Sequence, residues 1–378
     1  MPASGQSPDV LVLGLGGMGS AAAMHLARRG ARVVGFDRFG PAHDRGSSHG
    51  ESRLIRQAYF ESPAYVPLLK RAYQLWGDLE AASDGSLLHR TGLILLGKRV
   101  GTAAAIAHDH GIAIESLTAA ETSARFPGLV VSEDLVGLFE PGAGWLGVEA
   151  CVEAHLGAAT SAGATLCFDE TVTSWRVDDR TGEAVVVTTR GTYRAGKLVI
   201  AGGAWAPSLL ADIGVPLQAH RVVQMWFEAP TDPRFPCFAF DLERGFFYGF
   251  PRKDGRVKVA EHAARDPVDS PEQARREVSD DEARRVEGFV RDHLPGLRTP
   301  RATARTCLYT MTPDEHFVVD LHPRHPGVAI AAGMSGHGFK FASVIGEVLA
   351  DLALEGRTRH DISFLGCHAR LPVSKPRS

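Results

Sequence analysis

The sequence predicts an α/β fold, α+β overall, in which a Rossmann-like nucleotide-binding domain carries an inserted domain built on an antiparallel sheet. Three observations predict it. A strand–glycine turn–helix–strand unit occupies residues 9–37, buried-strand patterns return at 197–201 and 328–332, and the stretch 219–305 is rich in aromatic, strand-like segments. The chain has 378 residues. Because single cores stop growing at roughly 250–300 residues, two domains are expected.

The N-terminal unit reads in order as strand, turn, helix and strand. DVLVL (9–13) is almost wholly apolar, GLGGMG (14–19) follows, an alanine-rich helix is predicted at 20–29, and RVVGF (32–36) leads to Asp37. Glycines in such a turn let the backbone approach a pyrophosphate at a helix N-terminus, and an acid after the second strand can bind ribose hydroxyls. The unit therefore predicts a dinucleotide site made by Gly14, Gly16, Gly17, Met18, Gly19 and Asp37.

The middle of the chain alternates helix and strand patterns. Helices are predicted at 65–82 and 148–162, and strands at 92–96, 165–168, 173–177, 184–189 and 197–201. After the aromatic stretch, a charged helix is predicted at 271–294, and the nucleotide-binding pattern returns with the strand 328–332 and a helix at 339–354. We expect the nucleotide-binding domain at 1–60, 145–218 and 306–370, and the second domain at 61–144 and 219–305, with a frayed tail after His368.

Composition excludes several classes of protein. The net charge of −3 gives no reason to expect nucleic acid or an anionic membrane as a partner. Five scattered cysteines without CxxC spacing argue against a disulfide framework or a zinc site. Neither a signal peptide nor an apolar run of about 18 residues is visible, so a cytoplasmic protein is expected. The run 314–316 (DEH) has poor ligand geometry, and no metal site is predicted.

The glycine fingerprint does not choose between NAD and FAD, but three later features favour a flavin. The nucleotide-binding pattern is interrupted and returns late in the chain. A second glycine-rich junction at 331–340 (AAGMSGHGFK) aims another helix N-terminus at the site, where it can stabilise negative charge on a flavin. The small-residue loop 46–53 (GSSHGESR) is suited to lie beside a flat ring. This predicts contacts from Ser47, His49, Gly333, Gly336 and Gly338.

Motifs spread over nearly the whole chain carry a family resemblance. They are GLGGMGSAAAMHLARRG, GSSHGESRLIRQAY, YVPLLKRAYQLW, VIAGGAWAP, FFYGFP, CLYTMTPDEHFVVDLHP and IAAGMSGHGFKFASVIGE. The chain resembles the monomeric sarcosine oxidase and N-methyltryptophan oxidase family, within the D-amino-acid-oxidase-like flavoenzymes. The resemblance implies an FAD-dependent oxidase of the secondary amines of small amino acids, which yields an imine that hydrolyses and hydrogen peroxide.

The resemblance also implies roles for residues whose sequence context alone does not indicate a function. Cys307, which could be an inert core thiol, would carry a thioether to the flavin. Strand alternation places Lys258 and His262 on one face of RVKVAEH (256–262). That face could be a solvated edge, but the resemblance implies that Lys258 assists oxygen reduction and His262 helps to position substrate.

A carboxylate clamp is expected from Arg53 and Lys340, with Arg56 as an alternative, because a guanidinium binds a carboxylate through two parallel hydrogen bonds. Tyr248 and Tyr309 would line the substrate pocket, although either could be a packing residue. No side-chain general base is assigned.

Two departures from the family pattern put sarcosine itself in doubt: Ala239 replaces a bulkier residue, and the segment between Tyr248 and Lys258 is one residue shorter. Three alternatives stay open. They are a flavin oxidase or dehydrogenase of a cyclic imino acid or bulkier amine, a catalytically inactive nucleotide-binding protein, and an NAD-dependent dehydrogenase. Small-molecule amine and O2 are the expected partners, and nothing demands more than a monomer.

Overall fold

A computed structural model describes residues 7–263 and 265–368, and its frame is two large β-sheets. The first sheet has the strand order β20-β21-β13-β1-β2-β9. Its strands are β1 (Val10–Leu13), β2 (Val33–Phe36), β9 (Thr165–Cys167), β13 (Lys197–Ile200), β20 (Val318–His322) and β21 (His325–Ala332). All neighbours are parallel except the β20–β21 hairpin. This is the sheet predicted from the N-terminal unit and the two later buried strands.

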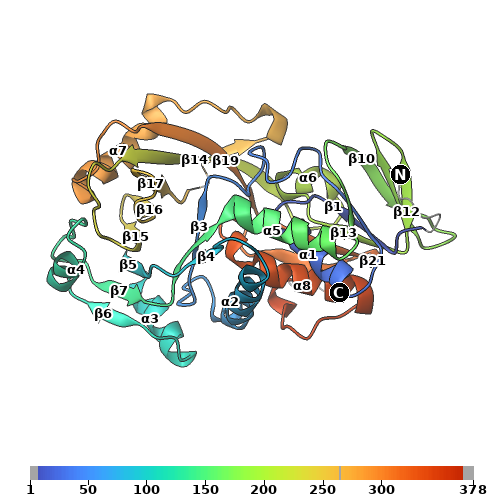
Figure 1. Cartoon of the computed structure of the whole chain (residues 1–378), viewed down its shortest axis with the longest axis horizontal. Coiled ribbons are helices and arrows are strands. Elements are labelled where there is room, and N and C mark those ends of the chain that lie inside the picture. The colour runs from blue at the N-terminus through green and yellow to red at the C-terminus, as the bar shows by residue number, and fades with distance from the viewer. Residues whose placement is uncertain (1–6, 264, 369–378) are drawn as a thin grey trace, which may run out of the picture.

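Three helices pack on this sheet, and a fourth, α2, packs on two of them. They are α1 (Gly17–Arg28), α2 (Val66–Ala81), α5 (Val148–Ser161) and α8 (Ala342–Glu355). Figure 1 shows α1, α5 and α8 lying side by side next to β1, β13 and β21. α1 and α8 approach so closely that a Cβ at Gly346 would lie 2.4 Å from the Cβ of Ala21. The small residue there lets the two helices meet, and both begin at the same end of the sheet.

The second sheet is larger and mainly antiparallel, with the order β18-β14-β17-β16-β15-β5-β7-β6 and β19 paired to β14. Its strands are β5 (Leu93–Gly97), β6 (Glu115–Leu117), β7 (Gly137–Glu140), β14 (Gln218–Glu228), β15 (Cys237–Leu242), β16 (Gly245–Gly249), β17 (Arg256–Glu261), β18 (Asp266–Val268) and β19 (Thr303–Met311). One face is an aromatic core against α7 (Asp280–His293), where Phe247 stacks on Phe289. Because side chains alternate, Lys258, Tyr248 and Cys307 lie on the other face.

Two three-stranded sheets accompany the two large sheets. β10 (Val172–Val177), β11 (Ala184–Thr188) and β12 (Thr192–Ala195) form a three-stranded sheet, which Figure 1 shows beside the first large sheet. β3 (Ser52–Ile55), β8 (Gly144–Gly147) and β4 (Leu88–His89) form another. β3 follows directly on the loop 46–51, so this small sheet positions the loop that was expected to lie beside a flat ring.

Most predicted elements are present within a few residues of their expected bounds, but the helix predicted at 271–294 was wrong at its start. Pro271–Gln273 form a single 3₁₀ turn, and α7 begins only at Asp280, after a capping box between Ser279 and Glu282. The helices α3 (Val100–Asp109) and α4 (Ala119–Arg125) were not predicted. The expected domain boundary at 305/306 lies inside β19, and the frayed tail lies outside the described residues.

Candidate active site

A cavity of about 750 Å³ runs between the two sheets. Its lining includes the turn after β1, the acid after β2, the turn after β13, the loop 46–48, strands β15, β16 and β19, and the turn before α8. Most of the predicted site residues therefore line one cavity, although they are spread over three hundred positions of the chain. The predicted residues that do not line it are Gly19, His49, Lys258 and Cys307. Volumes of this size are usual for ligand pockets.

One end of the cavity is built by the N-terminal turn. Gly14 has φ +86°, and a Cβ there would lie 2.5 Å from the carbonyl oxygen of Ala201. A Cβ at Gly19 would collide with the carbonyl oxygen of Gly14, so this glycine lets α1 pack on its own turn. Asp37 accepts hydrogen bonds from the backbone N–H groups of Leu15 (2.8 Å) and Phe39 (3.0 Å). The carboxylate is thereby held at the cavity, as the sequence predicted.

Cys307 is buried beside Arg53, which lines the cavity. The Arg53 guanidinium donates to the carbonyl oxygen of Ser47 (2.8 Å) and lies 3.4 Å from the Cys307 sulfur. Burial alone would raise the pKa of Cys307, but Arg53 and the neighbouring His49 lower it to about 7. The thiol is fully buried and has substantial thiolate character near neutral pH.

Lys258 is buried outside the cavity lining and is 4% exposed. Its ammonium donates to the carbonyl oxygens of Gly50 (2.5 Å), in the loop before β3, and of Ser52 (3.0 Å), at the start of β3. Burial lowers the pKa of Lys258 well below its ordinary value, and the positive charge of Arg53 lowers it further. Glu149 holds the same loop by accepting from the N–H groups of Gly50 and Glu51.

The far end of the cavity holds a second cationic cluster around Lys340. The Lys340 ammonium donates to the carbonyl oxygen of His337 at 2.8 Å. Burial lowers the pKa of Lys340 to about 7, and Arg56 contributes more to this than Arg53 does. Arg56 is paired with Glu61, at 2.7 and 2.8 Å to the two carboxylate oxygens. Although burial opposes ionisation of Glu61, Arg56, His337 and Lys340 hold its pKa below the ordinary value.

Aromatic residues fill the space between the two cationic clusters. His262 follows β17, and its Nδ1 lies 3.3 Å from the Tyr309 hydroxyl. Burial lowers the pKa of His262 to about 4, so the imidazole is neutral at physiological pH. Burial also raises the pKa values of Tyr248 and Tyr309, which keeps both phenols protonated. Gly336 lies against the Tyr309 ring, where a Cβ would approach within 2.4 Å.

The FAD dependent oxidoreductase family matches residues 9–352 of the chain. The chain is 45% identical to the monomeric sarcosine oxidase of Streptomyces avermitilis (strain ATCC 31267), over 94% of this chain and 96% of that protein. It is 34% identical to an N-methyl-L-tryptophan oxidase of Salmonella dublin, over 94% and 97%. The chain belongs to the monomeric sarcosine oxidase and N-methyltryptophan oxidase family. It is an FAD-dependent oxidoreductase that acts on CH–NH groups.

Solved structures agree with this family assignment. NikD, an unusual amino acid oxidase essential for nikkomycin biosynthesis, matches in its open form with a TM-score of 0.85 and 29% identity. The match covers 96% of this chain and 97% of NikD. Glycine oxidase from Geobacillus kaustophilus, at 23% identity and a TM-score of 0.81, shares the fold. The resemblance stated from the sequence motifs is therefore confirmed, and membership excludes the NAD-dependent and inactive alternatives.

FAD fits the cavity of this family member. The glycine turn and Asp37 suit the pyrophosphate and ribose, and Gly333, Gly336 and Gly338 line the cavity before α8. His49, which was expected to touch the flavin, is buried beside Cys307 and lies outside the cavity lining.

Several cavity residues were missed in the sequence. They are Ser48, which accepts from the Gly17 N–H at 3.1 Å, and Glu61, His337, Arg99 and Trp205, which line the cavity. Ser48 lies in the loop already chosen and could have been found from it. Glu61 and Arg99 carry no motif, because their place depends on how the second sheet faces the first.

A further cluster, Asp212, His322 and His325, brings three ligand atoms within 4.8 Å of one another outside the cavity. Two of its members, Asp212 and His322, already have partners without an ion. The backbone N–H of Arg324 donates to Nδ1 of His322, whose Nε2 lies 3.2 Å from Asp212, and Arg324 also pairs with Asp212. The cluster therefore closes the β20–β21 turn.

Among the described residues no helix is long and apolar enough to cross a membrane.

Proposed function

We propose that the protein oxidises the secondary amine of a small amino acid of the sarcosine or N-methyl amino acid type. The observation that carries this proposal is the buried cationic cluster of Lys340 and Arg56, facing a pocket of tyrosines and neutral His262 beside the flavin end of the cavity. Bound FAD supplies the redox chemistry, taking two electrons with a hydrogen from the substrate and passing them to O2 as hydrogen peroxide. The substrate loses a C–H and an N–H bond, and water hydrolyses the resulting imine.

Lys340 would bind the substrate carboxylate together with an arginine. Arg53 was the expected partner, but its guanidinium is engaged with Ser47 and Ser52 beside Cys307. Arg56 has the larger electrostatic effect on Lys340, but its Nη2 binds both carboxylate oxygens of Glu61 and its Nη1 donates to the carbonyl oxygen of Ala58. We therefore propose that the substrate carboxylate takes the place of Glu61 on Arg56, while Arg53 stays with the flavin and Cys307.

The remaining residues would orient substrate and oxygen. Neutral His262 and the protonated Tyr309 give the amine no anionic partner, which favours its reactive free-base form. Lys258 would place a positive charge where oxygen is reduced. Cys307, with its lowered pKa, is the nucleophile for a covalent link to the flavin.

An absorbance spectrum followed by acid precipitation tests the cofactor, and oxygen consumption tests the substrate. Flavin bands with a yellow pellet are expected for the native protein, and a yellow supernatant for Cys307→Ala. A colourless pellet from the native protein would end the proposal of a covalent link. In the second assay sarcosine and N-methyl amino acids should consume O2 and form equal amounts of peroxide. Equal inactivity towards every secondary amine would overturn the proposed activity.

A cyclic imino acid or bulkier amine is the second candidate. Ala239 lines the cavity between Leu95 and Tyr248, its partners on the neighbouring strands, so a small side chain leaves space on this wall. Pipecolate and proline belong in the same oxygen assay, and a higher kcat/KM for them than for sarcosine would select this candidate.

The setting of the enzyme is also proposed. Its five cysteines are free, which suits a reducing cytoplasm. We propose that it acts there as a monomer, with an FAD-binding domain formed around the first sheet and a substrate domain around the second. Sedimentation of the holoenzyme at a single monomer mass would support this state.

A further inference from the structure

The chain between β18 and α7 leaves the second sheet, contacts residues that follow strands of the first sheet, and returns. Residues 268–273, here called the strap, contain the 3₁₀ turn Pro271–Gln273, and residues 269–272 line the cavity. They do so at the end that also holds Asp37 and Trp205, where the adenosine part of FAD fits. Figure 1 shows this part of the chain in light orange above β14 and β19.

One carboxylate ties the strap to the nucleotide-binding sheet. Glu272 pairs with Arg38, which follows β2, and accepts from the indole N–H of Trp205 (2.7 Å), which follows β13. Within the strap, the Ser270 hydroxyl donates to the other Glu272 oxygen at 2.6 Å. Burial opposes ionisation of Glu272, but these donors lower its pKa to about 2. The tie is therefore charged throughout the physiological range.

Only the middle of the segment depends on this tie, because its two ends are anchored to the second sheet. At one end β18 pairs with β14. At the other, buried Arg221 of β14 donates to the carbonyl oxygens of Arg275 (2.5 Å) and Glu277. A small apolar cluster of Ala204, Ala274 and Leu308, with Trp205 and Val268 beside it, lies beneath the strap. Such a segment can open in its middle while both ends stay in place.

We propose that the strap closes the adenosine end of the FAD site, and that its release through Glu272 is the path by which FAD loads. Glu272 and Trp205 are then positioning residues for cofactor retention, remote from the reacting groups. The inference rests on FAD binding and is independent of which amine is oxidised, so failure of the proposed substrate would leave it untouched.

The test measures FAD release in the Cys307→Ala background, so that no covalent link hides dissociation. Flavin fluorescence should show release accelerated roughly fivefold in Glu272→Gln, as expected for loss of one partly exposed ion pair and a charged hydrogen bond. Trp205→Phe keeps an aromatic ring, although a smaller one, but removes the indole N–H, and should act in the same direction. Glu115→Gln, which breaks the surface pair with Arg125 away from the cavity, is the matched control and should leave release unchanged.

Limited trypsin digestion of the apoprotein gives a second readout. Cleavage after Arg275 and Arg276, which adjoin the strap, should be suppressed by FAD and faster in Glu272→Gln than in the Glu115→Gln control. Unchanged FAD release together with unchanged cleavage in both Glu272→Gln and Trp205→Phe would overturn the proposal. A general loss of folding would instead raise cleavage across the whole chain.

Discussion

At the scale of single residues, the site depends on burying cations beside one another. Lys258 and Lys340 are almost completely buried, and burial lowers the pKa of each. At Cys307, by contrast, the nearby positive charges of Arg53 and Lys258 lower the pKa and so favour the ionised form, the thiolate. An incoming carboxylate or a reduced flavin is therefore stabilised by charges that the protein holds in place before either arrives.

Carboxylate binding should depend on pH through Lys340. Its pKa of about 7 is lowered from the ordinary value, so the charged form is present below that pH and lost as pH rises through it. A short carboxylic acid without an amine, titrated by flavin absorbance, should bind with constant affinity below about pH 6. Its affinity should fall by up to roughly tenfold per pH unit above 7.

Lys340→Arg should remove that fall, because an arginine stays charged through pH 9, whereas Lys340→Met should bind weakly at every pH. The groups facing Lys340 are Arg56, Glu61 and Arg53. A fall that persists in Lys340→Arg would assign the titration to another group.

Lys258→Met should slow reoxidation of the reduced enzyme by O2 much more than anaerobic reduction by substrate. A positive charge near oxygen stabilises the negative charge that develops on it, and removal of one such electrostatic contact typically costs roughly a hundredfold in rate. Stopped-flow traces of the two half-reactions provide the measurement. Equal slowing of both would indicate that Lys258 supports the loop before β3 and does not act on oxygen.

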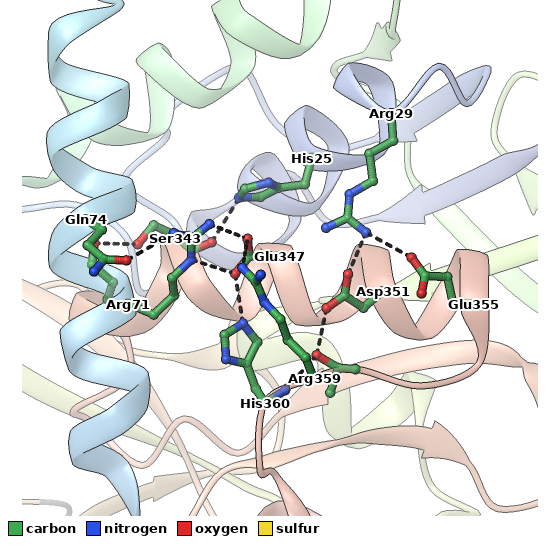
Figure 2. Close-up of polar contacts among 12 residues, drawn as sticks. His25, Arg29, Arg71, Gln74, Ser343, Glu347, Asp351, Glu355, Arg359 and His360 are labelled. Atoms are coloured by element: carbon green, nitrogen blue, oxygen red, sulfur yellow. Dashed lines mark hydrogen bonds and ion pairs between the residues drawn. The ribbon is translucent and has the colours of Figure 1, made fainter.

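At the scale of elements, α8 is the helix that places Lys340, which lies directly before it. Figure 2 shows Glu347 of α8 bound by three side chains: Arg71 of α2, and Arg359 and His360 of the segment after α8. The Arg71 Nη2–Oε1 distance is 2.6 Å, and His360 Nε2 lies 2.8 Å from Oε2. This network fixes α8 against α2, and so fixes the turn from which Lys340 projects.

Glu347→Gln should lower the free energy of unfolding by about 2 kcal/mol at pH 7, since it removes the charge-assisted hydrogen bonds of a buried carboxylate. Burial opposes ionisation of Glu347, but His360 and Arg71 hold its pKa well below the ordinary value. Its contribution is therefore present above about pH 4.3, the unfolded value, and is lost as pH falls below it. Denaturant melts at pH 7 and pH 4 should show a smaller difference in Glu347→Gln than in the native protein.

The matched control is Glu115→Gln, whose pair with Arg125 is exposed on both sides. It should change the free energy of unfolding by less than about 0.5 kcal/mol. A loss of similar size in both variants would mean that the Glu347 network adds nothing beyond an ordinary surface pair.

At the scale of the whole molecule, the cavity is made by neither sheet alone. The first sheet supplies the glycine turn and Asp37, and the second supplies Ala239, Tyr248 and Tyr309. A cofactor seated between them contacts both, so binding should couple their stabilities.

Removal of FAD should therefore lower the melting temperature of the whole protein and separate the melting of the two sheets. In Cys307→Ala, added FAD at a free concentration a hundredfold above its Kd should restore about 2.7 kcal/mol. Calorimetry with and without FAD provides the test. Identical melting of apoprotein and holoprotein would contradict the view that the cofactor bridges the sheets.

Local pattern determined much of this protein. The glycine turn, Asp37 and the facing of Lys258 and His262 follow from short-range rules, because apolar runs, glycine conformations and strand alternation act within a few residues. The family motifs identified the enzyme class in the same way. The start of α7 is also set by a local pattern, the capping box of Ser279 and Glu282, which the sequence prediction passed over in favour of the proline turn before it.

Only the tertiary structure decided which partners the charged side chains of the site contact. Arg53 and Arg56 are three positions apart, yet one contacts Cys307 and the other Glu61 near Lys340, because β3 turns their side chains towards different parts of the cavity. The contact of Glu272 with Arg38 and Trp205 likewise joins residues more than sixty positions apart. Such pairings depend on the packing of one sheet against the other, which no local spacing in the chain encodes.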